Sequence, residues 1–160
     1  ASDNGPSGID YYEITGGASG TLTSGSGTFS GLTPSSQGSN TISVRAVDNA
    51  GNAGAAATFT VDYDTVAPTI GGALSANAST ISGFSVTDPG GGNASGIASG
   101  TYGSSAGATF NGTTLTSLVA LADPGSQDYV LTVDDEAGNT GTRTVRHSRS
   151  GSTYTATFDP

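Results

Sequence analysis

The chain has 160 residues, of which 33% are hydrophobic and 11% charged, and this length has room for one large domain or two small ones. A net charge of −9, with four Arg and no Lys, argues against nucleic acid as a partner, because phosphate contacts need basic side chains. No apolar run approaches the length of a membrane span or a signal peptide, so we expect a soluble chain without a membrane span, from which any export signal has been removed.

The first half of the chain predicts short strands joined by tight turns. A strand is expected at Ile9 to Thr15, and a second short apolar signal, TFSGL, follows at Thr28 to Leu32. Apolar and polar residues then alternate with a period of two in Thr41 to Ala46 and again in Ala57 to Tyr63, as in strands with one buried face. The cluster Asp48 to Asn52 between them is rich in turn residues, which predicts a hairpin.

The same landmarks return in the same order in the second half. SGI at Ser7 to Ile9 reappears at Ser95 to Ile97, and VRAVDNAGN at Val44 to Asn52 reappears as LTVDDEAGN at Leu131 to Asn139. We expect Tyr129, at the start of this second strand, to have a structural role. A repeat of this length predicts two consecutive domains of roughly 80 residues.

The predicted boundary lies in the linker DYDTVAPTI, where Pro68 removes a hydrogen-bond donor and favours extended backbone before it. We expect domains at 1–64 and 65–149 and a separate segment at 150–160. The second copy carries two strands, PTIGGAL and TISGFSV, ahead of its SGI. The first copy has no counterpart of them, so its first strands are predicted to be absent.

The C-terminal segment TYTATFDP predicts one more strand. In this segment every second residue from Thr153 to Thr157 is Thr, and the residues that follow each Thr are Tyr154, Ala156 and Phe158. If the two ends of the chain were joined, Phe158 would lie as far ahead of the first SGI as Val86 lies ahead of the second. We therefore expect the segment to complete an N-terminal domain, by strand addition in the next repeat, the next subunit or the chain's own first domain. A frayed tail is the alternative.

The paired SGI motifs, VDNAGN with DEAGN, and the linker DTVAP at Asp64 to Pro68 resemble the bacterial immunoglobulin-like domains of Big type that occur in tandem in large extracellular adhesins and surface fibres. This resemblance implies an all-β fold of two tandem immunoglobulin-like Greek-key β-sandwiches, the first incomplete and completed by a C-terminal strand. It also implies rod-like arrays on cell surfaces, sometimes stiffened by calcium between domains.

Catalysis has little support in the sequence, and we expect no enzyme. His147 is the only histidine, lies among Arg143, Arg146 and Arg149, and has no acidic neighbour in sequence to orient it as a base. We expect it to be a solvated surface residue.

Calcium is the better chemical hypothesis, because hard cations take carboxylate and carbonyl oxygens and the acidic residues gather in loops and in the linker. The candidate metal ligands are Asp62, Asp64, Asp134, Asp135 and Glu136, with Asp3, Asp48 and Asp88 as weaker additions. The same residues are equally explained as turn formers that need no metal.

Three tyrosines form a possible ligand-stacking surface for a glycan, because their rings offer flat apolar faces with a polar tip. They are Tyr11, Tyr12 and Tyr63. Packing in a core or at a domain interface is the alternative role.

The sequence as a whole predicts a structural subunit or repeat of an extracellular filament or adhesin stalk. Its expected partner is itself, as a head-to-tail homopolymer built by strand complementation or as neighbouring repeats in one chain. The alternative is a glycan- or protein-binding immunoglobulin-like module attached to a secreted protein.

Overall fold

The computed structural model describes residues 5–16, 20–23, 34 and 36–159. These residues form antiparallel β-sheets, and the helical structure among them is the 3-10 turn η1 (Gly91–Asn93). The predicted all-β class is confirmed. The chain divides into two compact units, unit 1 (Ala1–Asp64) and unit 2 (Thr65–Pro160).

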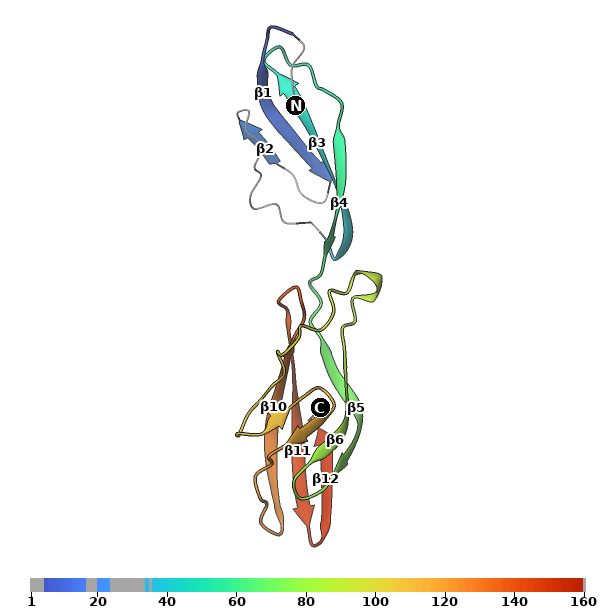
Figure 1. Cartoon of the computed structure of the whole chain (residues 1–160), viewed down its shortest axis with the longest axis vertical. Helices are drawn as coiled ribbons and strands as arrows, with labels where there is room; N and C mark the ends of the chain where they lie inside the picture. The colour runs from blue at the N-terminus through green and yellow to red at the C-terminus, as the bar shows by residue number, and fades with distance from the viewer. Residues whose placement is uncertain (1–4, 17–19, 24–33, 35, 160) are drawn as a thin grey trace. The chain divides into compact units, whose positions relative to one another are not determined.

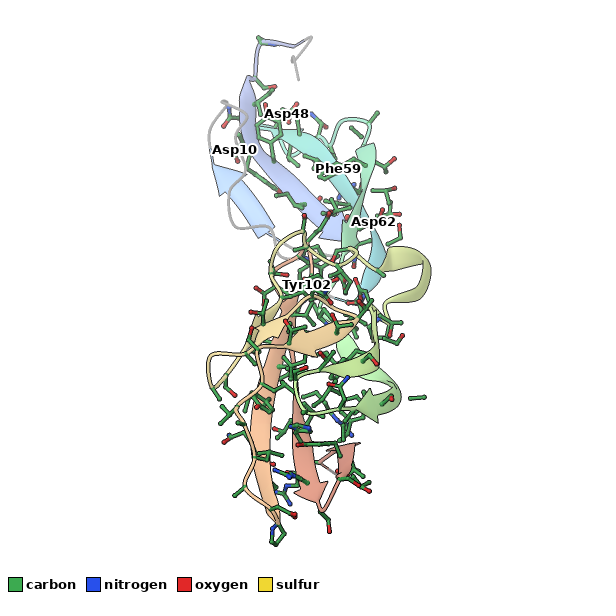
Figure 2. All side chains as sticks on the ribbon, turned by 60° about the horizontal axis from the view of Figure 1, so that its bottom comes forward. Asp10, Asp48, Phe59, Asp62 and Tyr102 are labelled. Carbon is green, nitrogen blue, oxygen red and sulfur yellow. The ribbon has the colours of Figure 1, made fainter. Side chains whose placement is uncertain are left out.

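The described part of unit 1 forms one sheet with the strand order β2-β1-β3-β4 (Figure 1). Its strands are β1 (Ile9–Gly16), β2 (Gly20–Thr23), β3 (Gly38–Asp48) and β4 (Ala57–Tyr63). Val44 on β3 lies opposite Ile14 on β1 and opposite Ala57 on β4, so these strands share one apolar face. Ile14 and Ile42 are buried on this face, whereas Phe59 on β4 is 45% exposed (Figure 2).

Unit 2 contains two sheets, with the strand orders β5-β6-β9-β8 and β12-β11-β10-β7. The strands of the first are β5 (Thr69–Ala76), β6 (Ile81–Thr87), β8 (Thr109–Phe110) and β9 (Thr114–Thr116). Those of the second are β7 (Gly103–Ser104), β10 (Gly125–Asp134), β11 (Thr140–Ser150) and β12 (Thr153–Phe158).

The two sheets of unit 2 enclose one hydrophobic core. The first sheet contributes Ile70, Ile81, Phe84, Phe110 and Leu115, and the second contributes Tyr129, Leu131, Val133 and Val145. Each of these side chains is less than a tenth exposed. Alternate residues of β10 are buried because they face the second sheet, which explains the period-two pattern in the sequence.

Tyr129 is fully buried in this core, and its hydroxyl accepts a hydrogen bond from the backbone N–H of Val119, at 2.8 Å. The ring fills part of the core, and the hydroxyl provides an acceptor for the Val119 N–H in a loop. Tyr129 therefore has a structural role, as the sequence predicted.

The repeated sequence motifs form the same substructure in both units. In unit 1 the carbonyl of Gly8 accepts a hydrogen bond from the Asn49 N–H at 3.1 Å, and in unit 2 the carbonyl of Gly96 accepts one from the Glu136 N–H at 2.9 Å. Thus the SGI segment of each unit is bonded to that unit's own AGN loop. Each loop turns at a glycine with positive φ, Gly51 at 86° and Gly138 at 90°.

The C-terminal segment does not complete unit 1. It forms β12, which pairs with β11 over the register Ser150↔Thr153 to Val145↔Phe158, so it belongs to unit 2. The physical reason is local, because Gly151 at φ 62° turns the chain directly from β11 into β12 and leaves the two strands adjacent. The sequence prediction for this strand's partner is corrected accordingly.

One glycine of β11 lies directly against the backbone that leads into β5. A Cβ built at Gly141 on β11 would collide with the backbone carbonyl of Pro68, just ahead of β5. The counterpart of Gly141 in unit 1 is Gly54, because AGNTG and AGNAG end on these residues. At Gly54 a Cβ would meet only ordinary contact, 3.6 Å from the carbonyl oxygen of Ala46.

We predict that Gly141→Ala lowers the free energy of unfolding of unit 2 by about 1–3 kcal/mol, because the added methyl forces the Pro68 backbone away. The matched change Gly54→Ala should leave unit 1 unchanged or slightly stabilised, since a methyl fits there and restricts the unfolded chain. Thermal unfolding of both variants checks this. Equal destabilisation by the two changes would contradict the difference in packing.

Candidate metal centre

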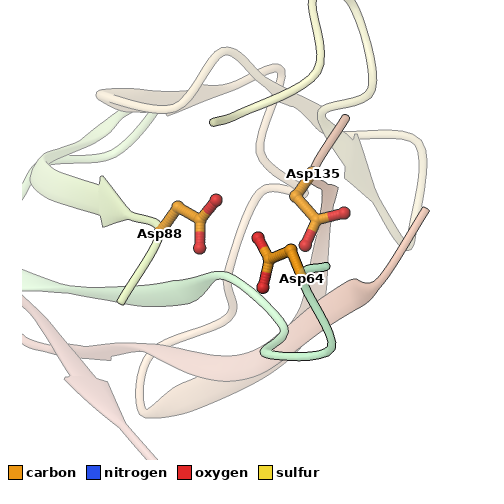
Figure 3. A group of neighbouring side chains, drawn as sticks. All are labelled: Asp64, Asp88 and Asp135. Carbon is orange, nitrogen blue, oxygen red and sulfur yellow. The ribbon is translucent and has the colours of Figure 1, made fainter. Parts of the chain in front are cut away.

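Three aspartates form the candidate site. Asp64, Asp88 and Asp135 each contribute one carboxylate oxygen, and these three oxygens lie within 4.8 Å of one another (Figure 3). Asp88 and Asp135 belong to unit 2, and Asp64 is bonded directly to the first residue of that unit, Thr65. Asp135 and Asp64 are buried and Asp88 is half-buried.

Local hydrogen bonds hold each carboxylate. Both oxygens of Asp135 accept bonds from Asn139, one from its backbone N–H and one from its side-chain amide, each at 2.8 Å. Asp88 follows β6 and accepts a 2.8 Å bond from the N–H of Gly96, in the SGI segment. Asp64 accepts a 3.0 Å bond from the side-chain amide of Gln37. The repeated motifs thus orient two of the three acids.

The arrangement suits a hard cation. Three carboxylates at this separation repel one another when ionised, and burial reduces the screening of that repulsion by water. A divalent ion removes the repulsion and supplies the charge that the nearby donors, all uncharged amides, do not. Carboxylate and backbone oxygens are the ligands that Ca²⁺ prefers. The three acids could hold such an ion.

The structure brings together only part of the predicted ligand set. Asp64 and Asp135 are in the group, joined by Asp88, which the sequence suggested only as a weaker addition. Asp134 instead accepts a 2.6 Å hydrogen bond from the Thr140 hydroxyl. Asp62 lies exposed on β4 (Figure 2), and Glu136 is exposed in the AGN loop. Asp134 is the last residue of β10 and directly precedes Asp135, so the two side chains point in opposite directions. Asp62 lies within β4, whereas Asp64 follows the end of that strand.

In unit 1, Asp48 is the counterpart of Asp135, at the start of the first AGN loop (Figure 2). Its oxygens accept bonds from the Asn52 side chain at 2.9 Å, the Asn52 N–H at 2.8 Å and the Ala50 N–H at 2.9 Å. The hydrogen bond from the Asn52 side chain is the main reason that the pKa of Asp48 lies below its ordinary value. The residues of this loop therefore close the turn through their own hydrogen bonds.

His147 is buried in unit 2, not solvated as the sequence suggested. It lies on β11, is 0% exposed, and stacks on Tyr154 of β12 with ring centroids 5.5 Å apart. Its Nε2 donates to the carbonyl of Asn77 at 3.0 Å, since a carbonyl can only accept, and Nδ1 has no partner among the described residues. Buried and stacked in this way, the ring packs like a core residue.

The predicted stacking tyrosines are not gathered on one surface. Tyr11 and Tyr12 are successive residues of β1 and point to opposite faces of the sheet. Tyr12 is opposite Ala46, near the end of β3, whereas Tyr63 is opposite Gly38 at the start of β3. At about 3.4 Å per residue these two positions are roughly 25 Å apart along the strand.

The predicted complementation residues Tyr154, Ala156 and Phe158 contact unit 2. Arg149 lies over the Tyr154 ring at 5.7 Å from its centroid, and Arg143 over the Phe158 ring at 5.2 Å. Phe158 also meets Phe84 edge-on, at 6.0 Å between centroids. These contacts hold β12 on its own unit.

No protein-family model matches the sequence, and comparison with curated proteins found no similar sequence. Among the residues that the structure describes, none form a helix of the length and apolarity needed to cross a bilayer.

We predict that unit 2 loses stability as the pH falls below about 6.5. Burial lowers the pKa of His147, an effect opposed by the hydrogen bond to Asn77, so the unfolded chain takes up a proton before the folded chain does. Stability is therefore full above the unfolded pKa and is lost as the pH falls toward the folded pKa. Melting temperatures of the wild type and His147→Gln between pH 7.5 and 5 check this, and the variant should show the flatter profile. Parallel profiles would contradict the role of His147.

Proposed function

We propose that this chain is a structural repeat of an extracellular filament or adhesin stalk, in which units follow one another in one polypeptide. The observation that carries the proposal is the repeated substructure, an SGI segment bonded to an AGN loop, in two consecutive units. A substructure duplicated in series is typical of proteins that gain length by repetition, whereas an enzyme or receptor site needs to be built only once.

Strand order supports an immunoglobulin-like identity for the units. In unit 2, β5-β6-β9-β8 has the order A-B-E-D and β11-β10-β7 has the order G-F-C, as in the constant-type immunoglobulin sandwich. The extra strand, β12, lies beside the last strand of the second sheet. In unit 1, β1, β3 and β4 correspond to strands C, F and G.

The surface chemistry fits a crowded extracellular fibre. The outward positions of β4 are Thr58, Thr60 and Asp62, all exposed, and the chain carries a net charge of −9. Small polar side chains keep the surface hydrated, and the net negative charge makes neighbouring fibres repel one another. Since β12 is bonded within unit 2, covalent succession of units replaces donation of this strand as the proposed mode of assembly.

Calcium binding by Asp64, Asp88 and Asp135 is part of this proposal. The ion would join the linker carboxylate of Asp64 to the loop acids of unit 2 and remove their mutual repulsion.

The mechanical role predicts that unit 2 resists extension. Concatenated copies of the chain, stretched in a force microscope, should show a force peak for each unit 2, followed by release of about 300 Å of chain at roughly 3.5 Å per residue. The hydrogen-bonded ladders and the shared core must break together, which is why a peak is expected. Extension without a peak, together with specific binding on a glycan array, would favour the binding-module alternative.

Calcium should raise the melting temperature of the wild-type chain, and a chelator should reverse the rise, because binding to the folded state alone stabilises it. Asp88→Asn should abolish the shift while leaving the metal-free chain as stable or more stable, since it removes one of three repelling charges. Glu136→Gln is the matched control, because Glu136 lies in the same region but outside the group. Calorimetric titration that gives no heat with the wild type would contradict the site.

A further inference from the structure

An open groove lies along β3 of unit 1, where Tyr12 and Arg45 line it together with smaller residues. It has a volume of about 420 Å³, and the residues that line it include Val44, Ala46, Gly54 and Ala57. The first two are on β3, the last begins β4, and Gly54 lies in the segment between the strands. Farther along β4, Phe59 is 45% exposed.

The matching face of unit 2 is closed. Aligning the AGN loops pairs Val44 with Leu131 and Ala46 with Val133, and both residues of unit 2 are 0% exposed. The strands that pair with β3 and β10, namely β4 and β11, show the same difference in exposure. Phe59 faces Ile42 as Val145 faces Tyr129, and Val145 is 0% exposed. The residues that bury this face in unit 2 come from the first sheet, with Ile70, Ile81 and Phe84 on β5 and β6 and Phe110 and Leu115 on β8 and β9.

Two matching glycines indicate where the described residues of unit 1 leave this face open. In unit 2 the absence of a Cβ at Gly141 makes room for the Pro68 carbonyl, where the chain enters β5. The counterpart Gly54 lines the groove of unit 1, and its N–H donates to the Ala46 carbonyl at 2.8 Å, which keeps it in the same place relative to β3. Unit 1 therefore retains the glycine of this interface.

We propose that the groove of unit 1 is a docking surface for a two-stranded β-ribbon with the residue pattern of β5 and β6, contributed by the repeat ahead of it in an array. The inference rests on the proposed tandem arrangement, and it adds the partner and the place where it binds. The ribbon lays its branched and aromatic side chains over Val44, Ala46 and Phe59, and the start of its first strand passes Gly54. The interface is the one that unit 2 forms internally.

The test is a fusion that supplies this ribbon. A copy of Thr65 to Asp88 placed directly ahead of Ala1 keeps the spacing between its last residue and Ser7 that Asp88 keeps from Ser95 in unit 2. Amide hydrogen exchange in β3 and β4 should slow at least tenfold relative to the unfused chain. Exchange in β10 and β11 is the internal control and should not change.

Two matched variants of the fusion complete the experiment. Gly54→Ala should abolish the protection, because its methyl would meet the carbonyl that enters the first strand of the ribbon, although a methyl fits there in the unfused chain. Phe84→Asp, made only in the added copy, should do the same by placing a charge in the interface. Protection that is absent in the parent fusion, or equal in all three fusions, would overturn the proposal. Neither result bears on the mechanical role of unit 2, which the force measurement tests separately.

Discussion

The packing of one apolar strand face against a second sheet is the interaction on which this structure depends. In unit 2 the face formed by β10 and β11 is covered by the sheet β5-β6-β9-β8, and the central side chains Leu131, Val133 and Val145 are completely buried. A single sheet cannot bury its own face, and the free energy of burial, about 25 cal/mol per Å² of apolar surface, is lost wherever that face meets water. In unit 1 the equivalent face is only partly buried, and Phe59 marks its open side.

The duplicated loops explain how the same sequence signals serve both architecture and chemistry. Asp48 and Asp135 each close an AGN turn by accepting bonds from an asparagine four residues later. In unit 2 that carboxylate also meets Asp88 and Asp64, so a turn-forming acid becomes part of a candidate cation site. The turn-forming carboxylate of Asp135 becomes part of this site only because Asp88, the residue directly after β6, lies beside it. Asp88 and the strands β5 and β6 are thus supplied by the same stretch of chain.

Sequence reasoning reached the all-β class, because strand periodicity and turn residues act locally and leave a direct pattern. It also identified Asp64 and Asp135, since acids in loops are visible in the sequence. It gave Asp88 less weight than Asp62 and Asp134, because the acids that the fold brings together depend on strand pairing that the sequence does not display. It also misjudged His147 and β12. His147 contacts Tyr154 on β12 and Asn77 in the turn between β5 and β6, and the tight turn at Gly151 decides the partner of β12.

The central claim is that unit 1 has an incompletely covered face and unit 2 a complete core. Residue-resolved amide exchange of the unmodified 160-residue chain tests it most directly. The account predicts that the amides of β10 and β11 exchange only through global opening of unit 2, while those of β3 and β4 exchange orders of magnitude faster through local opening. Equal protection of β4 and β11 would show that the face of unit 1 is already closed and would contradict the account.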